Sequence, residues 1–197
     1  MRPVISGAVE GAVDEAAFKR LVTVVGADPG PIYGKQGKAH LLSRVAGYNH
    51  AAARSPWLVI LDLDRSAECA PEFVRTLPEI APFMCLRVAV RSIESWILAD
   101  VSSVCEWTGL SRAAVTVDVA SLTDPKRHLI GLVQRSRRTS LIADVVPRLG
   151  AGRTEGPGYA GQMIDFFGTR WVVEAAAARC DSLAKAVKCL ERLVERL

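Results

Sequence analysis

The stretch Trp57-Leu58-Val59-Ile60-Leu61-Asp62-Leu63-Asp64 decides the fold. It is apolar except for its two aspartates; Pro56 precedes it and the polar Arg65-Ser66 follows. A short apolar run with β-branched residues in its middle predicts a strand that is buried on both faces. Such strands are typical of a parallel sheet that is covered by helices on both sides.

The two aspartates stand at the carboxyl end of this predicted strand. Strand side chains alternate, so Asp62 and Asp64 are expected on the same face, with α-carbons roughly 6.7 Å apart. Carboxylates at this spacing can share one hard cation, and Mg²⁺ takes oxygen ligands at about 2.1 Å. Ligands also bind at the carboxyl ends of strands in open α/β sheets. The alternative is an aspartate pair that caps the next turn and faces water.

The first half of the chain alternates between strand and helix patterns. Apolar runs at residues 3–9 and 84–90 predict two more strands, and periodic segments near residues 13–25, 39–54 and 71–77 predict helices. Residues 26–37 are rich in Gly and Pro and predict a loop, with a short extended piece at 31–33. We therefore expect an α/β fold with a mostly parallel central sheet, right-handed crossovers and helices on both faces.

After Val90 the pattern becomes helical. Ser92 is the expected cap of the first of these helices, and Asp124-Pro125 predicts the start of another. Further helices are expected near residues 141–149, where Pro147 must bend or stop the helix, and near 159–167 and 171–180. We expect residues 1–100 to form the α/β core and residues 101–197 a helical extension packed on it, as one compact unit.

The last predicted helix begins at Asp181 or Ser182. It carries one apolar stripe at helical spacing, formed by Leu183, Val187, Leu190, Val194 and Leu197. We expect this stripe to pack on the body of the protein. The alternative is a contact between two copies of the chain.

Composition excludes several classes. The 197 residues carry 25 Lys and Arg against 21 Asp and Glu, a net charge of +4 that is compatible with a nucleic-acid or phosphate partner. The five cysteines form no Cys-x-x-Cys pair and no run is apolar enough to span a membrane, and we expect no signal peptide. The expectation is a cytoplasmic protein with reduced thiols and no membrane partner.

Acidic residues end or follow three of the predicted strands. Glu10 follows the first, Asp62 and Asp64 end the central one, and Glu94 lies just beyond the strand at 84–90. If these strands are neighbours, four carboxylates gather at one edge of the sheet, where their mutual repulsion favours a bound Mg²⁺ or Mn²⁺. Such an ion can activate water and stabilise charge on a phosphoryl group. The alternative is that Glu10 and Glu94 are merely polar ends of a strand and a helix.

These residues resemble the Toprim domain of topoisomerases, primases, recombination proteins and OLD-type (overcoming lysogenization defect) nucleases. The shared features are Glu10-Gly11 after a first strand and Asp62-x-Asp64 after a later one. The run from Arg91 to Asp100, Arg-x-x-Glu-x-Trp-x-x-Ala-Asp, is more specific and resembles an uncharacterised bacterial family of Toprim-like proteins. Further segments of the chain share this second resemblance: Val9-Glu10-Gly11 with Glu15-Ala16-Ala17-Phe18, Asp124-Pro125-Lys126 and Gly158-Tyr159.

The resemblance implies a Toprim-like fold and roles for particular residues. Glu10 would be a general acid/base or a metal ligand, Asp62 and Asp64 metal ligands, and Glu94 would help to hold a second ion. Arg91 would bind a phosphate oxygen, or else form a salt bridge to Glu94 or Asp100. Trp96 is expected in the core, and Asp100 is expected to end its helix.

Basic segments supply candidate phosphate contacts. Lys35 and Lys38 flank glycines, but their spacing is not that of a Walker A loop. Gly156-x-Gly158-x-x-Gly161 matches the dinucleotide fingerprint in letters only, because no strand precedes it. Lys126 begins a basic stretch in the second half, which either contacts a nucleic-acid backbone or is a solvated helix face; it continues with Arg127, Arg135, Arg137, Arg138, Arg148 and Arg153.

The leading expectation is a Mg²⁺-dependent phosphodiesterase or nuclease acting on nucleic acid, in phage defence by way of the OLD-type resemblance, as a homodimer or in a larger defence complex. One alternative is a non-catalytic protein of the same fold that binds nucleic acid or a partner. Another is a nucleotide-handling phosphotransfer enzyme.

Overall fold

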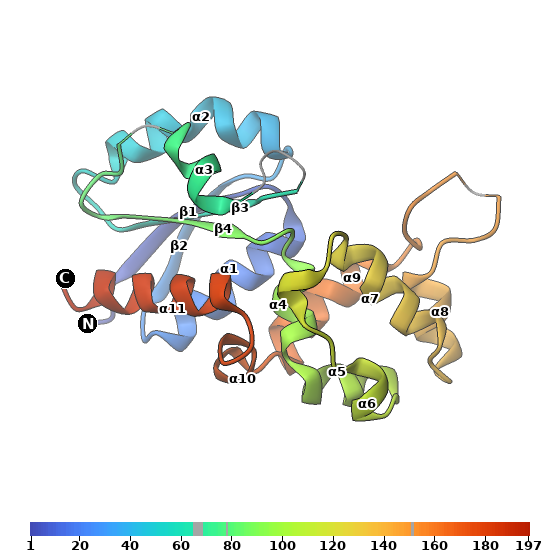
Figure 1. Cartoon of the computed structure of the whole chain (residues 1–197). Coiled ribbons are helices and arrows are strands. Elements are labelled where there is room, and N and C mark those ends of the chain that lie inside the picture. The colour runs from blue at the N-terminus through green and yellow to red at the C-terminus, as the bar shows by residue number, and fades with distance from the viewer. Residues whose placement is uncertain (65–68, 78, 151) are drawn as a thin grey trace.

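The computed structural model describes residues 1–64, 69–77, 79–150 and 152–197. A parallel sheet of four strands lies at its centre, in the order β2-β1-β3-β4 (Figure 1). The strands are β1 (Val4–Val9), β2 (Asp28–Gly34), β3 (Trp57–Asp62) and β4 (Met84–Ala89). This sheet, with helices on both faces and a helical C-terminal part, confirms the predicted α/β class.

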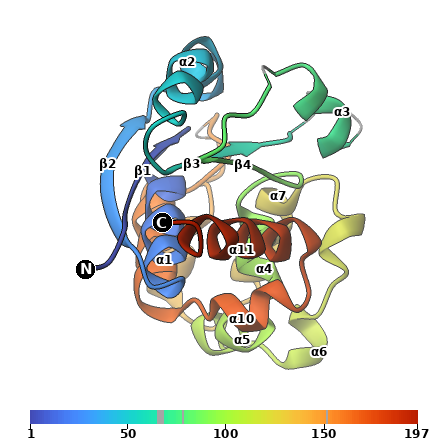
Figure 2. The ribbon, with the colours of Figure 1, turned by 90° about the vertical axis from the view of Figure 1, so that its left-hand side faces the viewer.

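Helices cover the two faces of the sheet in the arrangement that its strand order requires. They are α1 (Ala12–Val24), α2 (Lys38–Ala51), α3 (Ala70–Arg75) and, from the far end of the chain, α11 (Asp181–Val194). Figures 1 and 2 place α2 and α3 on one face and α1 and α11 on the other. In the sheet, β2 lies on one side of β1, and β3 and then β4 lie on the other side. Crossovers of one hand must then use opposite faces.

The alternation of β3 divides its side chains between two cores. Leu58 and Ile60 belong to a core with α1, α11 and the C-terminal helices, while Trp57, Val59 and Leu61 belong to a second core under α2 and α3. All five are buried, which confirms the prediction of a strand covered on both faces.

The helical part is a series of short helices beyond β4 (Figure 1). They are α4 (Glu94–Ala99), α5 (Val101–Thr108), α6 (Arg112–Val115), η1 (Val119–Ser121), α7 (Pro125–Gln134), α8 (Thr139–Val145), α9 (Tyr159–Asp165), the π-helical η2 (Phe166–Arg170) and α10 (Val173–Ala177). Two buried tryptophans tie this part together: Trp171 Nε1 donates to the Trp96 carbonyl at 3.0 Å, and the rings stack at 6.4 Å. Trp96 Nε1 in turn donates to Ser182 Oγ in α11 at 3.0 Å.

Several local predictions are confirmed. Trp96 is fully buried, and Asp100 ends α4 and caps α5, accepting from Ser103 N at 3.2 Å. α8 stops at Val145, before Pro147. The stripe of α11 packs on the body of the protein, with Leu183 and Leu190 fully buried, although Leu197 at its end is exposed.

Three local predictions are wrong. Residues 28–34 form the edge strand β2 in place of most of the predicted loop, although the expected extended piece at 31–33 lies within this strand. The prolines at 29 and 31 concealed the strand, because proline is tolerated in strands chiefly at edges. Ser92 does not cap α4, whose N-cap is Ile93, because its hydroxyl bonds a carboxylate instead. β3 ends at Asp62 and Asp64 has a left-handed φ of +51°, so strand alternation does not relate the two aspartates. The predicted turn residues Arg65-Ser66 lie outside the described part of the chain.

No helix in the described ranges is both long and apolar enough to cross a membrane.

Candidate functional site

The site begins where the strand order of the sheet reverses. β2 lies on one side of β1 and β3 on the other, so the carboxyl ends of β1 and β3 border the crevice where such sheets bind ligands. Glu10 follows β1 and Asp62 ends β3. The two residues are in contact: Glu10 Oε1 accepts from the Asp62 backbone N–H at 2.8 Å.

Asp14 joins these acids, and sequence reasoning missed it. It lies in the first turn of α1, is 7% exposed, and its Oδ2 accepts from the Gly11 backbone N–H at 2.9 Å. Burial, and next the charge of Glu10, raise the pKa of Asp14 to about 7. Its position in the sequence could have predicted this, because an acidic residue in the first turn of a helix that directly follows a strand lies near the carboxyl end of that strand.

Asp62 is the centre of the cluster. Its Oδ1 is buried and has no hydrogen-bond partner in the described structure. Burial raises the pKa of Asp62 well above its usual range, and the charges of Asp14, Glu94 and Glu10 raise it further. Burial also raises the pKa of Glu10. The cluster therefore holds more carboxylate than its surroundings neutralise.

Glu94 reaches the same cluster from the start of α4. It is 5% exposed, and both of its oxygens are bonded: Tyr159 Oη donates to Oε1 at 2.7 Å and Ser92 Oγ donates to Oε2 at 2.5 Å. Tyr159 begins α9, 65 residues further along the chain. Burial, and next the Glu94 charge, raise the pKa of this tyrosine, so it remains a hydroxyl donor.

Asp64 forms an ion pair with Lys38 at the exposed side of the site. Its side chain is half exposed, and Lys38 Nζ lies 3.1 Å from its Oδ2. The same ammonium donates to the carbonyl oxygens of Asp62 and, at 3.2 Å, of Leu63, and it lies 5.1 Å from the centre of the Phe73 ring. Lys38 thus supplies a fixed positive charge beside the end of β3.

A pocket of about 520 Å³ opens on this edge of the sheet. Asp62, Asp64 and Glu94 line one part of it, with Arg91 and Ser92. The start of α7 lines the remainder, through residues 123–126. Asp62, Asp64 and Glu94 therefore face a cavity that is large enough for a phosphodiester group, whereas Glu10 and Asp14 do not line it.

The four predicted phosphate contacts take different places. Arg91 and Lys126 line the pocket. Arg91 Nη1 donates to the Asp64 carbonyl at 3.1 Å, and Lys126 Nζ lies 4.6 Å from the Tyr159 ring centre and pairs with Glu155. Lys38 is the fixed cation described above. Lys35 pairs with Glu15 of α1 at 3.1 Å and does not line the pocket.

The donor set has the chemistry that Mg²⁺ and Mn²⁺ prefer, because all of its candidate ligands are carboxylate oxygens. The unpartnered buried Oδ1 of Asp62 also fits a cation. In the described part of the chain, however, no three acidic, histidine or cysteine side chains already converge on one ion position. Glu10, Asp14 and Glu94 instead use oxygens to accept protein hydrogen bonds.

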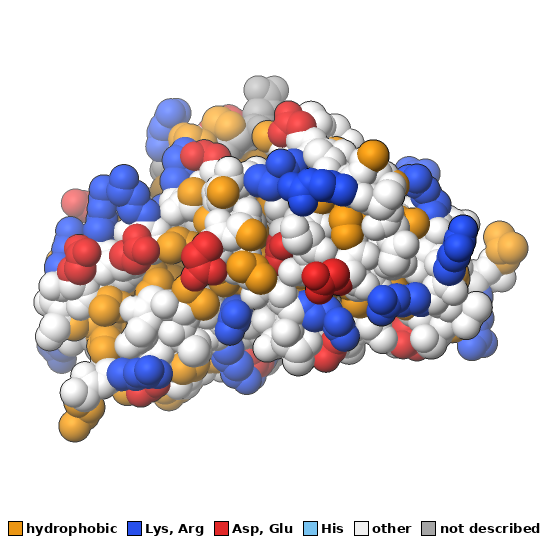
Figure 3. Space-filling model, turned by 90° about the horizontal axis from the view of Figure 1, so that it is seen from below, with side chains coloured by type: hydrophobic (Ala, Val, Ile, Leu, Met, Phe, Trp, Pro, Cys, Tyr) orange, Lys and Arg blue, Asp and Glu red, His pale blue; other side chains and the backbone are white. Residues whose placement is uncertain are grey.

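The basic residues of the second half are exposed, as a solvated helix face or a backbone-binding surface would be. Arg138 Nη2 donates to the Glu106 carbonyl at 2.7 Å. On the face of the molecule drawn in Figure 3, basic and acidic side chains are interleaved, and apolar atoms lie between them. The exposed arginines are Arg127, Arg135, Arg137, Arg138, Arg148 and Arg153.

Comparisons of the chain with protein-family models, with curated proteins and with solved structures found no match.

Proposed function

We propose that this protein is a Mg²⁺- or Mn²⁺-dependent phosphodiesterase that acts on nucleic acid, of the Toprim-like kind its motifs resemble. The observation that carries the proposal is that Glu10, Asp14 and Glu94 lie near enough to Asp62 to raise its pKa, at the reversal point of the sheet, while Asp62 Oδ1 is buried without a partner in the described structure. From the resemblance to OLD-type nucleases we further propose that the protein acts in phage defence, as a homodimer or as part of a larger complex.

The residues divide into two groups by charge. Asp62, with Glu10 and Glu94, would hold a divalent ion, which when bound lowers the pKa of water and neutralises phosphoryl charge. Arg91 and Lys126, on the walls of the same pocket, would bind and orient the phosphate oxygens. Glu10, whose pKa is raised by burial, suits proton transfer near neutral pH better than an ordinary carboxylate does.

The test is cleavage of supercoiled plasmid, single-stranded DNA and RNA in the presence of Mg²⁺ or Mn²⁺. We expect Asp62→Asn to lower the cleavage rate by about 100-fold or more, the scale of a lost catalytic group. Glu174→Gln is the matched control, because Glu174 is exposed on α10 and its substitution also replaces a carboxylate with an amide. Wild-type protein that cleaves none of the substrates, or equal rates in both variants, would contradict the proposal.

A second measurement separates metal binding from turnover. At pH 8, Mn²⁺ is expected to raise the Tm of the wild type, because an ion that binds only the folded state stabilises it. Asp62→Asn is expected to lose most of this rise while Glu174→Gln keeps it. An equal rise in both variants would place the ion elsewhere.

The position of Lys38 favours one second candidate, a binding protein without turnover. Its ammonium already neutralises part of the acidic edge through Asp64 and two backbone carbonyls. Salt-dependent binding of nucleic acid, with no cleavage and no response to Mn²⁺, would favour this role.

A further inference from the structure

A second pocket lies between the edge strand β4 and the C-terminal helix α11. Its volume is about 240 Å³. None of its lining residues lines the carboxylate pocket described above. We call it the basic pocket; its lining residues are Pro82, Met84, Cys85, Arg87, Lys185, Lys188, Cys189, Arg192, Leu193 and Arg196.

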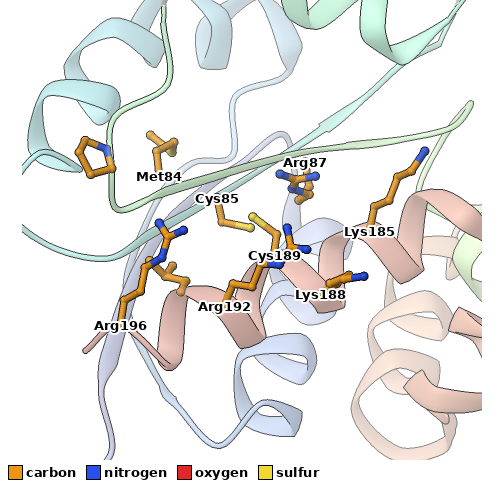
Figure 4. Close-up of a pocket in the computed structure, with 10 residues that line it drawn as sticks. Met84, Cys85, Arg87, Lys185, Lys188, Cys189, Arg192 and Arg196 are labelled. Carbon is orange, nitrogen blue, oxygen red and sulfur yellow. The ribbon is translucent and has the colours of Figure 1, made fainter.

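Half of these lining residues are cationic, and none is acidic. Arg87 enters from the strand, Lys185, Lys188 and Arg192 project from the helix, and Arg196 lies just after the helix ends (Figure 4). Lys185 is offset by Asp181, 2.7 Å away, and Glu191 and Glu195 of the same helix are exposed and do not line the pocket. In the described structure no ion pair involves Arg87, Lys188, Arg192 or Arg196.

Arg87 carries one buried donor for which the described part of the protein supplies no acceptor, although its side chain also interacts with Cys85 and Cys189. Its Nε is buried and has no hydrogen-bond partner in the described structure. A buried donor without an acceptor is costly, and an anion in the pocket would remove that cost. Like-charged side chains on the two walls also repel each other until an anion lies between them.

The pKa of Cys189 responds to the positive charge of the basic pocket. Figure 4 shows its side chain facing Cys85, between the strand and the helix. A hydrogen bond from Cys85, and next the charges of Arg87 and Arg192, lower the pKa of Cys189 to about 6 against the effect of burial. The charges of Arg87 and Arg192 therefore favour negative charge in this pocket.

We propose that the basic pocket binds a chain of two or three phosphate groups, the chemistry shared by inorganic pyrophosphate and triphosphate and by nucleoside di- and triphosphates. A single phosphate can meet only some of these cations, because the stretch from Lys185 to Arg192 alone extends for about 10 Å along the helix. The cations line a hollow from two walls, which suits a compact polyanion better than a long backbone.

The test is calorimetric titration with inorganic triphosphate, in EDTA so that no divalent ion bridges the ligand to the carboxylates. We expect one saturable site in the wild type. Lys188→Gln with Arg192→Gln is expected to weaken binding by about 30-fold or more, since each charged contact is worth roughly tenfold. The matched control is Arg44→Gln with Arg54→Gln, two exposed arginines on and just after α2 that remove the same charge.

Further arms identify the ligand and the place. If adenosine triphosphate binds as tightly as inorganic triphosphate, the pocket recognises the phosphates alone. If adenosine triphosphate binds more tightly, the pocket recognises a nucleotide. Triphosphate should also slow alkylation of Cys189 while leaving that of the exposed Cys69 unchanged.

Three results would overturn the proposal: no saturable binding, equal binding in the two double variants, or loss of binding only in Lys126→Gln. Binding of duplex DNA that depends on Lys188 and Arg192, together with no binding of triphosphate, would also overturn the proposal and would indicate a nucleic-acid-binding surface instead.

Discussion

Glu94 shows how single residues keep the acidic site in shape. Its carboxylate is buried, and one oxygen accepts from Tyr159 while the other accepts from Ser92. A buried acceptor that loses its donor costs about 1–3 kcal/mol, more when it is charged. The tyrosine therefore fixes the position of the Glu94 carboxylate.

Tyr159→Phe removes that donor without changing the ring. We expect the free energy of unfolding to fall by about 1–3 kcal/mol, measured by denaturant titration. Tyr33→Phe is the control, because Tyr33 is 48% exposed and its hydroxyl makes no hydrogen bond in the described structure. Equal stability of the two variants would mean that water replaces the lost donor.

Asp14 makes stability depend on pH. Its pKa is raised to about 7 in the folded protein from the ordinary 3.8, so between about pH 4 and pH 7 the folded state binds more protons than the unfolded chain. The free energy of unfolding should therefore fall as the pH rises through that window. Asp62 and Glu10, whose pKa values are also raised, act in the same direction.

Asp14→Asn removes this titration. We expect the loss of stability between pH 5 and pH 8 to shrink by on the order of 2 kcal/mol, measured by denaturant titration at both pH values. Glu174→Gln should keep the wild-type loss. A profile for Asp14→Asn that matches the wild type would show that Asp14 titrates normally.

At the scale of elements, the contact between β1 and α1 depends on a missing side chain. A Cβ added to Gly7 would lie 2.0 Å from the ring of Phe18, which is fully buried. The helix can approach the strand this closely only because position 7 is glycine. The shape of the edge that carries Glu10 and Asp14 follows from that approach.

Gly7→Ala should therefore destabilise the protein by about 1–3 kcal/mol, the usual effect of overpacking. Gly47→Ala, in α2, meets nothing within 4 Å and should stabilise it by about 0.5–1 kcal/mol. Thermal unfolding of the two variants compares them directly. Changes of the same sign in both would contradict the close approach.

At the scale of the whole molecule, the end of the chain completes the core of its beginning. Leu183, Ala186 and Leu190 of α11 belong to the same buried cluster as Leu58, Ile60 and Cys85 of the sheet. α11 lies beneath β4 in Figures 1 and 2. The α/β core therefore depends on a helix that follows it by about a hundred residues in the sequence.

A chain ending at residue 180 should lose cooperative unfolding, because the apolar face of β4 would meet water. Circular dichroism during thermal unfolding measures this. The double variant Lys188→Gln with Arg192→Gln is the comparison, because it alters the exposed side of α11 and keeps its buried stripe. A truncated chain that unfolds as cooperatively as this variant would show that α11 is dispensable to the core.

The sequence was sufficient to predict those strands and helices whose apolar residues recur with a regular period. The apolar run at residues 57–61 marked β3, and the strand and helix alternation marked the α/β class. It also located Glu10, Asp62 and Glu94 near strand ends, which a parallel sheet brings to one edge. It failed at β2, where proline and glycine hide an edge strand whose stability comes from its neighbour.

Only the tertiary structure decided which groups meet. The bond from Tyr159 to Glu94 spans 65 residues, and the contact of Lys38 with Asp64 spans 26. The cations of the basic pocket come from β4 and α11, which no period in the sequence relates. The physical reason is that a period of two or of 3.6 residues fixes which face a side chain takes within its own element, whereas the partner of that face depends on the packing of the whole chain.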